Sequence, residues 1–333
     1  MKDCMTVDCN DSGVAFIVAH TGCRLDKVLK NPPTDSMCDF VPFKTFCFQD
    51  NTEGLVGIQV TTFEYEARLP EGAVVNPDFT TARELFPPTN HSVEELQKIT
   101  NNFNFKATSL VQRRYVFSKN AIASLQAEAT NKTMTHKPTR NEALTSFMWK
   151  HLTEASRTIA GSLFTSAITI AVSFRPRLKP PLSSNCFGNL ALSPPGLFYP
   201  SSKSEMSHLA HEIKLNIVSA DSDFIAKLQQ PGVIHEMMQG AESRMMEGIK
   251  QLVFTNWCNM GHYGIDFGWG IPAWVAFALK NDILNARYTI FMYAPSGTGI
   301  EVNVIGEEAE VSIMERNQEF LEFATINRSV VTC

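Results

Sequence analysis

The sequence lacks several features that would assign it to a common class. No apolar run is long enough to cross a membrane, and the first residues contain no apolar signal core. The eight cysteines form no Cys-x-x-Cys pair, so we expect free thiols in a reducing compartment. Gly-x-Gly-x-x-Gly, Walker and Gly-x-Ser-x-Gly motifs are absent, which argues against nucleotide cofactors held by such loops and against a serine nucleophile.

Basic residues are too few for a nucleic-acid surface. The chain has 29 Lys and Arg against 34 Asp and Glu, for a net charge of -5 at pH 7. Its densest basic groups, Arg113-Arg114 and Arg175-Pro-Arg177, are short. A phosphate-binding face needs a larger positive patch. We therefore expect neither nucleic acid nor a membrane as partner, and predict a cytoplasmic monomer that acts on small molecules.

What is present is an ordinary globular composition, with 44% hydrophobic and 19% charged residues. Hydrophobic periodicity predicts helices interleaved with strands, which indicates an α/β fold. The predicted strands cover residues 14–19, 57–63, 161–174, 288–293 and 300–305, with another that begins near residue 114 and ends at 117. The predicted helices cover residues 118–128, 139–155, 204–219, 233–252 and 314–324.

One helix start is marked by a capping box. Thr139 is followed three residues later by Glu142, and these side chains can satisfy the free amides of the first turn. The helix behind it places Phe147, Met148 and His151 on one face, so we expect that face to be buried.

Residues 86–110 are rich in proline, asparagine and polar residues, which is typical of a linker. We therefore divide the chain into a first domain at residues 1–88, a linker at 89–110 and a second domain at 111–333.

Three segments carry a family resemblance, and they occur in the expected order. They are residues 7–14, residues 175–182 with Phe187-Gly188-Asn189, and residues 255–272, which contain Asp266-Phe267-Gly268-Trp269-Gly270. The chain thereby resembles the plant acyl-CoA-dependent acyltransferases of the BAHD family, closest to the members that act on alkaloids.

The resemblance implies two domains of mixed sheets flanked by helices, with a solvent channel between them. It implies acyl-CoA as co-substrate, no permanently bound cofactor, no metal, and a hydroxyl or amine of a plant specialised metabolite as acceptor. Thr255, Asn256 and Trp257 then lie where the family lines the coenzyme A side of the channel. The loop Asp266–Gly270 and Arg175 take structural roles, and Arg175 would pair with the Asp of the family's His-x-x-x-Asp motif.

That His-x-x-x-Asp motif, whose histidine is the family's general base, should follow the strand at residues 57–63. Here the chain passes from Phe63 almost directly to Asn76, so the resemblance implies that a few dozen residues are missing and that the first domain is incomplete. An alcohol is a poor nucleophile until a base removes its proton, so we expect impaired activity. The alternative is a non-catalytic fragment or binding protein derived from the family.

One histidine, His262, is followed four residues later by an aspartate, Asp266. That aspartate opens the family's glycine-rich loop, and the glycines around it disfavour the helix that would put both side chains on one face. His262 therefore stays a candidate base, and no catalytic residue is assigned. A second polar group, His208 and His211 with Glu205 and Glu212, fits a solvated helix face better than a metal site.

Overall fold

A computed structural model describes residues 15–21, 25–30, 57–62, 110–130, 137–162, 165–184, 190–192, 194, 196–198, 205–230, 232–266, 268, 270–277 and 287–326. The chain forms two compact units. The larger comprises residues 105–260 and 285–326, and the smaller comprises residues 1–104, 261–284 and 327–333. The three-part division predicted from the sequence, with borders at residues 88 and 110, stays a prediction.

The smaller unit contains a pair of parallel strands. β1 (Ala15–His20) pairs with β2 (Gly57–Thr62) from one end to the other, with Ala15 opposite Gly57. Parallel strands need a crossover, and α1 (Leu25–Lys30) lies between them in sequence. Both strands confirm the predictions at residues 14–19 and 57–63.

The larger unit is built on a seven-stranded mixed sheet in the order β5-β4-β6-β7-β8-β3-β9. β4, β6 and β7 are parallel, while the remaining pairings are antiparallel. The strands are β3 (Leu110–Phe117), β4 (Ser166–Ile170), β5 (Gly196–Phe198), β6 (Lys250–Asn256), β7 (Arg287–Tyr293), β8 (Ile300–Glu307) and β9 (Ala324–Ile326).

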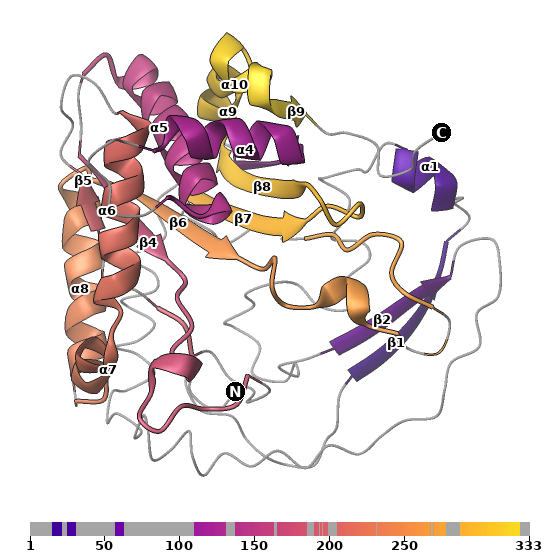
Figure 1. Cartoon of the computed structure of the whole chain (residues 1–333), viewed down its shortest axis with the longest axis horizontal. Coiled ribbons are helices and arrows are strands. Elements are labelled where there is room, and N and C mark those ends of the chain that lie inside the picture. The colour runs from indigo at the N-terminus through magenta and orange to yellow at the C-terminus, as the bar shows by residue number, and fades with distance from the viewer. Residues whose placement is uncertain are drawn as a thin grey trace. The chain divides into compact units, whose positions relative to one another are not determined.

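Helices α4, α5, α9 and α10 lie on one side of this sheet (Figure 1). The long helix α5 is central, because it packs against α4, α6 and α9. The mixed sheet with flanking helices confirms the predicted α/β class. The helices of the unit are α4 (Lys119–Glu128), α5 (Arg140–Ala160), α6 (Met206–Ser219), α7 (Ser222–Leu228), α8 (Val233–Met246), α9 (Glu308–Met314) and α10 (Gln318–Phe323).

The capping box at the start of α5 is confirmed. Thr139 Oγ1 accepts from the amide of Glu142 at 3.2 Å, and the Glu142 carboxylate accepts from the amide of Thr139 at 2.7 Å. The end of the helix was predicted wrongly. α5 continues to Ala160, and Gly161 caps it with φ 65°, a left-handed conformation that glycine adopts without strain. Gly161, the first residue of the strand predicted at 161–174, is therefore a helix cap, and the strand itself is the shorter β4.

Two further predictions were wrong at their boundaries. The helix predicted at residues 233–252 ends at Met246, and Gly248 follows with φ 78° before β6 begins at Lys250. The closing helix predicted at residues 314–324 begins only at Gln318, as α10, and a separate helix, α9, ends at Met314. Asn317 lies between them and caps α10 by accepting from the amide of Phe320 at 3.2 Å.

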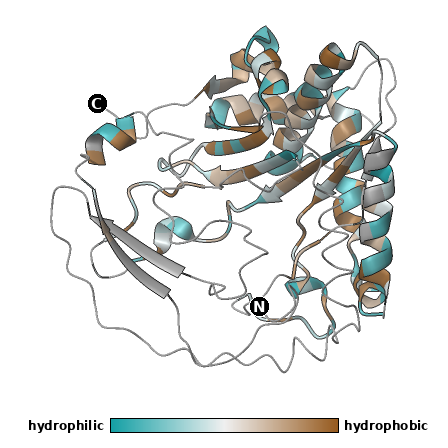
Figure 2. Cartoon of the chain, turned by 180° about the vertical axis from the view of Figure 1, so that it is seen from behind, coloured by the Kyte–Doolittle hydropathy of each residue, from teal (hydrophilic) through white to brown (hydrophobic). Residues whose placement is uncertain are grey.

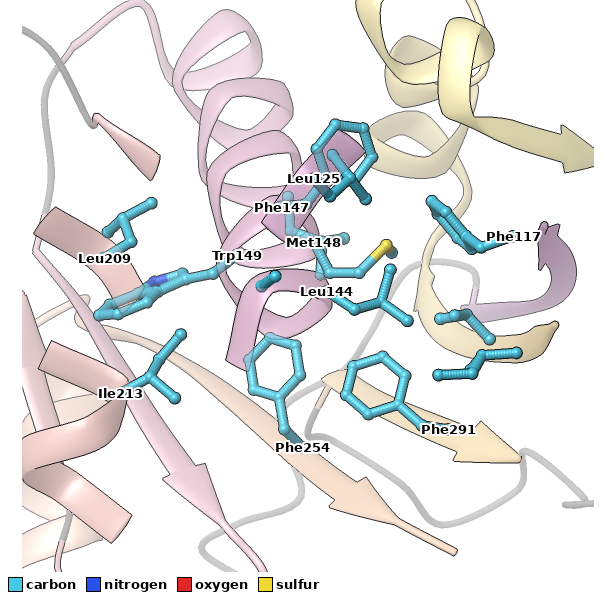
Figure 3. Packing of buried hydrophobic residues seen from close by; sticks show 14 of the residues in the cluster. Phe117, Leu125, Leu144, Phe147, Met148, Trp149, Leu209, Ile213, Phe254 and Phe291 are labelled. Atoms are coloured by element: carbon cyan, nitrogen blue, oxygen red, sulfur yellow. The ribbon is translucent and has the colours of Figure 1, made fainter. Parts of the chain in front are cut away.

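The core lies between α5 and the helix-facing side of the sheet. Leu144 of α5 points toward Phe254 of β6 and Phe291 of β7 (Figure 3). The Phe147 ring packs instead against Phe117 of β3 and Phe320 of α10, with ring centres 5.9 Å and 5.7 Å away, and these side chains and Met148 are all buried. The predicted burial of this helix face is confirmed. Figure 2 shows the matching pattern, with hydrophilic and hydrophobic residues alternating along the helices. Within the described ranges, no helix combines the length and apolar composition that crossing a bilayer requires.

Candidate functional site

The segments that follow three parallel strands all begin at one edge of the large sheet. β4, β6 and β7 run in the same direction (Figure 1), so they all end at this carboxyl edge. Pairing continues just past the strands, because the amide of Ala171 donates to Phe254 O at 2.9 Å and that of Trp257 to Phe291 O at 2.8 Å. Open α/β sheets bind ligands at the carboxyl ends of their strands. This edge is therefore the candidate site.

The end of β6 and the turn after it bring the predicted residues Thr255, Asn256 and Trp257 together. Trp257 Nε1 donates to Thr255 Oγ1 at 3.1 Å, and the amide of Cys258 donates to Asn256 Oδ1 at 2.9 Å. These bonds hold the turn in one shape. In both bonds the side-chain oxygen of Thr255 or Asn256 is the acceptor. The Thr255 hydroxyl and the Asn256 side-chain amide can therefore donate hydrogen bonds to a ligand.

Cys258 follows these residues and does not offer a nucleophile. Its side chain is buried, at 6% exposure. Burial raises the pKa of the Cys258 thiol to about 11, against a smaller opposing effect of the charge on Arg140. The thiolate is the reactive form of cysteine, so Cys258 is unreactive at neutral pH.

Arg140 supplies positive charge to the same edge. It is the first residue of α5, and its guanidinium carbon lies 5.7 Å from the centre of the Tyr293 ring. Its Nη2 donates to Thr298 O at 3.1 Å, and the Tyr293 hydroxyl donates to Asn259 Oδ1 at 3.4 Å. A guanidinium is a group that pairs with anionic ligands. Sequence analysis missed Arg140, although its place directly after a capping threonine was a usable signal.

The loop after β4 contains the Arg-Pro-Arg segment, which forms the short helical turn η2 (Arg175–Arg177). Arg175 is partly buried, and its carbonyl accepts from the amide of Leu182 at 2.8 Å. Its predicted pairing with the motif aspartate stays a prediction. Arg177 reaches the end of α6, where its Nη1 donates to Ile217 O at 2.6 Å and to Ala220 O at 2.7 Å.

The glycine-rich loop of the smaller unit is organised by its aspartate. Asp266 Oδ1 accepts from the amides of Gly268 at 2.7 Å and Gly270 at 2.9 Å. Both glycines have positive φ, at 101° and 104°. These bonds favour the structural role expected for the loop. Phe267 and Trp269 lie outside the described residues.

His262 begins the short helical turn η3 (His262–Gly264) of the same unit. The turn ends at Ile265, whose backbone is extended with φ -81° and ψ 126°. The α-helical geometry that would set His262 and Asp266 on one face is therefore absent from this segment. A catalytic pair of these two residues stays a hypothesis.

The polar group on α6 is a solvent-facing one. His208 and His211 are both exposed. Across the part of the chain that the structure describes, no group of three or more His, Cys, Asp or Glu side chains is arranged to hold a metal ion.

Comparison with known proteins identifies the class to which this fold and edge belong. A sequence model described as "Transferase family" matches residues 2–65 and 67–321. The chain belongs to this transferase family, the BAHD acyltransferases that its motifs resemble.

Individual relatives agree with this assignment. Akuammiline synthase 2 from Alstonia scholaris is 31% identical over 377 residues, which cover 99% of this chain and 81% of the relative. Vinorine synthase from Rauvolfia serpentina is 23% identical, over 93% of this chain and 76% of the relative. The crystal structure of vinorine synthase superimposes with a TM-score of 0.71 at 22% identity, covering 98% of this chain and 80% of that structure. This superposition confirms the two-domain acyltransferase fold that the motifs implied.

Proposed function

We propose that this chain binds acyl-CoA at the carboxyl edge of the large sheet, and that its capacity for acyl transfer is impaired. The acceptor class that we propose is a hydroxyl or amine of a plant specialised metabolite. The names of relatives support this class, since a stemmadenine O-acetyltransferase from Catharanthus roseus and an N-malonyltransferase from Strychnos nux-vomica are among them.

One observation carries the proposal of impaired transfer. The match to the family's sequence model is interrupted at residue 66, inside the interval between Phe63 and Asn76 where the His-x-x-x-Asp segment is expected. The alignment with akuammiline synthase 2 extends over 377 residues, more than the 333 of this chain, so it contains gaps on this side. Both findings support the omission of an internal segment. Loss of a general base costs about 100- to 10,000-fold in rate.

The chemistry of the edge supports coenzyme A as the ligand. Its phosphates are anionic, and the guanidinium of Arg140 at the start of α5 is a cation that can pair with them. The pantetheine arm carries amides, and the side chains of Thr255 and Asn256 offer donors for their carbonyls. Acyl-CoA would act as a co-substrate, without a permanently bound cofactor.

The second candidate function is a non-catalytic binding protein derived from the family. The same interruption at residue 66 favours it. The two functions differ only in turnover, since both retain the ligand edge.

A binding and turnover experiment tests the proposal. We expect calorimetric titration of coenzyme A into the whole chain to show saturable binding. Arg140→Ala should weaken that binding about tenfold, because a hydrogen bond to a charged group contributes about 1.5–3 kcal/mol. Arg316→Ala, which removes an exposed arginine of the same unit, is the matched control. Absence of binding by the unmodified chain contradicts both candidate functions.

Turnover separates the two. Release of free thiol from acetyl-CoA is followed in the presence of hydroxylated and amine-bearing alkaloids. We expect a slow rate that rises by orders of magnitude when a His-x-x-x-Asp segment of the family is inserted after Phe63. A rate that the insertion leaves at zero favours the binding protein.

The His262 hypothesis makes a different prediction for the same assay. If His262 is the base and Asp266 orients it, then His262→Ala and Asp266→Asn each abolish turnover in a folded protein. We expect both variants to retain the residual rate.

The chain is also proposed to be a cytoplasmic monomer. Light scattering on the purified chain tests the monomer, and a fluorescent fusion in leaf cells tests the compartment.

A further inference from the structure

Hydrogen bonds join the end of α6 to the connection between β4 and β5 at two points, and each of these points is called a hold below. This connection leaves β4 at the carboxyl edge proposed to bind coenzyme A, and its first part, residues 171–184, is called the β4 loop below. One hold is made by Arg177 of the β4 loop and the other by Asn216 of α6.

Arg177 satisfies carbonyls that the helix itself leaves open. The last four carbonyls of an α-helix have no partner within the helix. Arg177 Nη1 donates to two carbonyls at this end, Ile217 O at 2.6 Å and Ala220 O at 2.7 Å. The positive guanidinium also complements the negative end of the helix dipole. Because both bonds come from one planar group, they fix the position and orientation of the turn η2.

Asn216 makes the second hold from the opposite direction. Its Nδ2 donates to Pro194 O at 2.6 Å, and its side chain is 6% exposed. The chain then passes Asn216 so closely that a Cβ on Gly196 would lie 3.1 Å from Asn216 Nδ2 and 3.2 Å from Ile168 Cγ1. Glycine at position 196 therefore permits the approach, and the start of β5 is held against the same helix end.

The two holds are connected through backbone bonds of the β4 loop. The amide of Phe174 donates to Leu190 O at 2.8 Å, and the amide of Leu192 donates to Val172 O at 3.1 Å. Val172 and Phe174 follow Ala171, which is bonded to Phe254 next to Thr255 and Asn256 at the end of β6. The shape of the carboxyl edge next to these residues thus depends on where the end of α6 holds the chain.

We infer that Arg177 and Asn216 are positioning residues, which keep the β4 loop in the shape that accepts coenzyme A. The inference rests on the proposed function. A site that must order a loop on binding loses affinity in proportion to the fraction of molecules in which the loop is misplaced. By keeping the β4 loop in place in the free protein, Arg177 and Asn216 avoid this loss of affinity.

The test compares loop order and ligand affinity in the same proteins. Arg177→Ala and Asn216→Asp each remove one hold, Arg177→Lys keeps the charge but loses the planar guanidinium, and Arg316→Ala is the control. We expect faster hydrogen exchange at the amides of Phe174 and Leu192 in Arg177→Ala and Asn216→Asp. We also expect a Kd for coenzyme A about tenfold weaker in both, as for a loop correctly placed in a tenth of the molecules. Arg177→Lys should lie between the unmodified chain and Arg177→Ala in both measurements.

Three outcomes overturn the inference. Exchange and Kd unchanged in both variants mean that neither residue holds the loop. Faster exchange with an unchanged Kd means that the holds are structural and do not serve the ligand, while the proposed function stands. No binding of coenzyme A by the unmodified chain removes the proposed function together with this inference. Should Arg177→Ala fail to fold by circular dichroism, Arg177→Lys and Asn216→Asp decide by the same criteria.

Discussion

Arg114 and Glu301 form an ion pair inside the large sheet, with Nη1 and Oε1 2.9 Å apart and each side chain 2% exposed. They come from the neighbouring antiparallel strands β3 and β8. Removing two charges from water costs several kcal/mol, which their attraction only partly offsets. The pair is therefore costly to break and contributes little as a whole.

The first prediction follows from this asymmetry. Glu301→Ala should lower the free energy of unfolding by about 3–5 kcal/mol, because it leaves the Arg114 charge buried without its carboxylate. The double variant Arg114→Met with Glu301→Leu should recover most of that loss. Urea unfolding of the three proteins checks both statements. A double variant as unstable as Glu301→Ala would contradict them.

The second prediction concerns His151, which is 1% exposed and packs against aromatic rings, with the Phe147 ring 4.4 Å away and the Phe320 ring 5.5 Å away. Burial lowers the pKa of His151 to about 4, and the charge on Glu319 opposes this shift while that on Lys150 assists it. The unfolded chain, with an ordinary histidine pKa of about 6.5, therefore binds more protons than the folded chain between the two values. His151 should reduce stability as pH falls from about 6.5 to about 4.

Denaturant unfolding at a series of pH values measures this effect. A shift of this size corresponds to about 3 kcal/mol across the window. His151→Leu should flatten the slope by removing the titrating ring, whereas His211→Gln, at an exposed position of α6, should keep it. Equal slopes in all three proteins would show that His151 titrates normally.

The third prediction concerns Glu310 of α9, whose side chain is fully buried. Burial alone would raise the pKa of Glu310, but bonds from Arg287, Lys250 and Ser156 outweigh it and hold the pKa below its usual value. Arg287 Nε donates at 2.6 Å and Ser156 Oγ at 2.5 Å, and Lys250 is paired with the same carboxylate. Glu310→Gln should lower stability by about 1–3 kcal/mol.

The pH effect has the same sign as for His151, because the folded state lowers the pKa of both groups. Because the folded pKa is depressed, Glu310 stabilises the fold above its ordinary pKa, and this contribution disappears as pH falls through the folded value. Glu310→Gln should therefore differ from the unmodified chain most at neutral pH. Glu322→Gln, at an exposed position of α10, serves as control and should cost little at any pH.

The fourth prediction uses three glycines near Asp266. A Cβ on Gly268 or Gly270 would meet no atom of the described residues within 4 Å, so we expect substitution to act through the backbone. Gly268→Ala should destabilise the loop by about 1–2 kcal/mol, since φ 101° is unfavourable for alanine. Gly264 has equal space and no positive φ, so Gly264→Ala should be neutral or slightly stabilising. Hydrogen exchange at the Gly270 amide checks the pair, and equal exchange in the two variants would refute the argument.

The sequence predicted best those features that are encoded by near neighbours. Thr139 and Glu142 form the capping box as expected, because both partners lie within one turn. Ser118 likewise caps α4 through the amide of Ala121. In contrast, the helix predicted at residues 233–252 wrongly includes the first residues of β6, Lys250–Leu252. Gly248 and the inward alternation of Leu252 and Phe254 were the signals for a strand, but they are weak in so short a segment.

Features that depend on distant contacts could not be predicted from one sequence. The order of the seven strands decides which chain exits meet at the carboxyl edge, and it is set by packing over long separations. Arg140 and Tyr293 are 153 positions apart, and nothing in either local pattern indicates that they meet. The hydrogen bonds from Arg177 to the end of α6 could not be predicted either, because the free carbonyls of a helix end accept from any suitably placed donor.

The burial of Cys258 has a practical consequence. Thiol reagents attack the thiolate, and a buried thiol with a raised pKa presents very little of it, so labelling must await a local opening of the chain. The rate at which Cys258 is modified therefore reports how often the turn after β6 opens. A ligand bound at that edge would lower this rate, so binding could be detected without attaching a probe to the ligand.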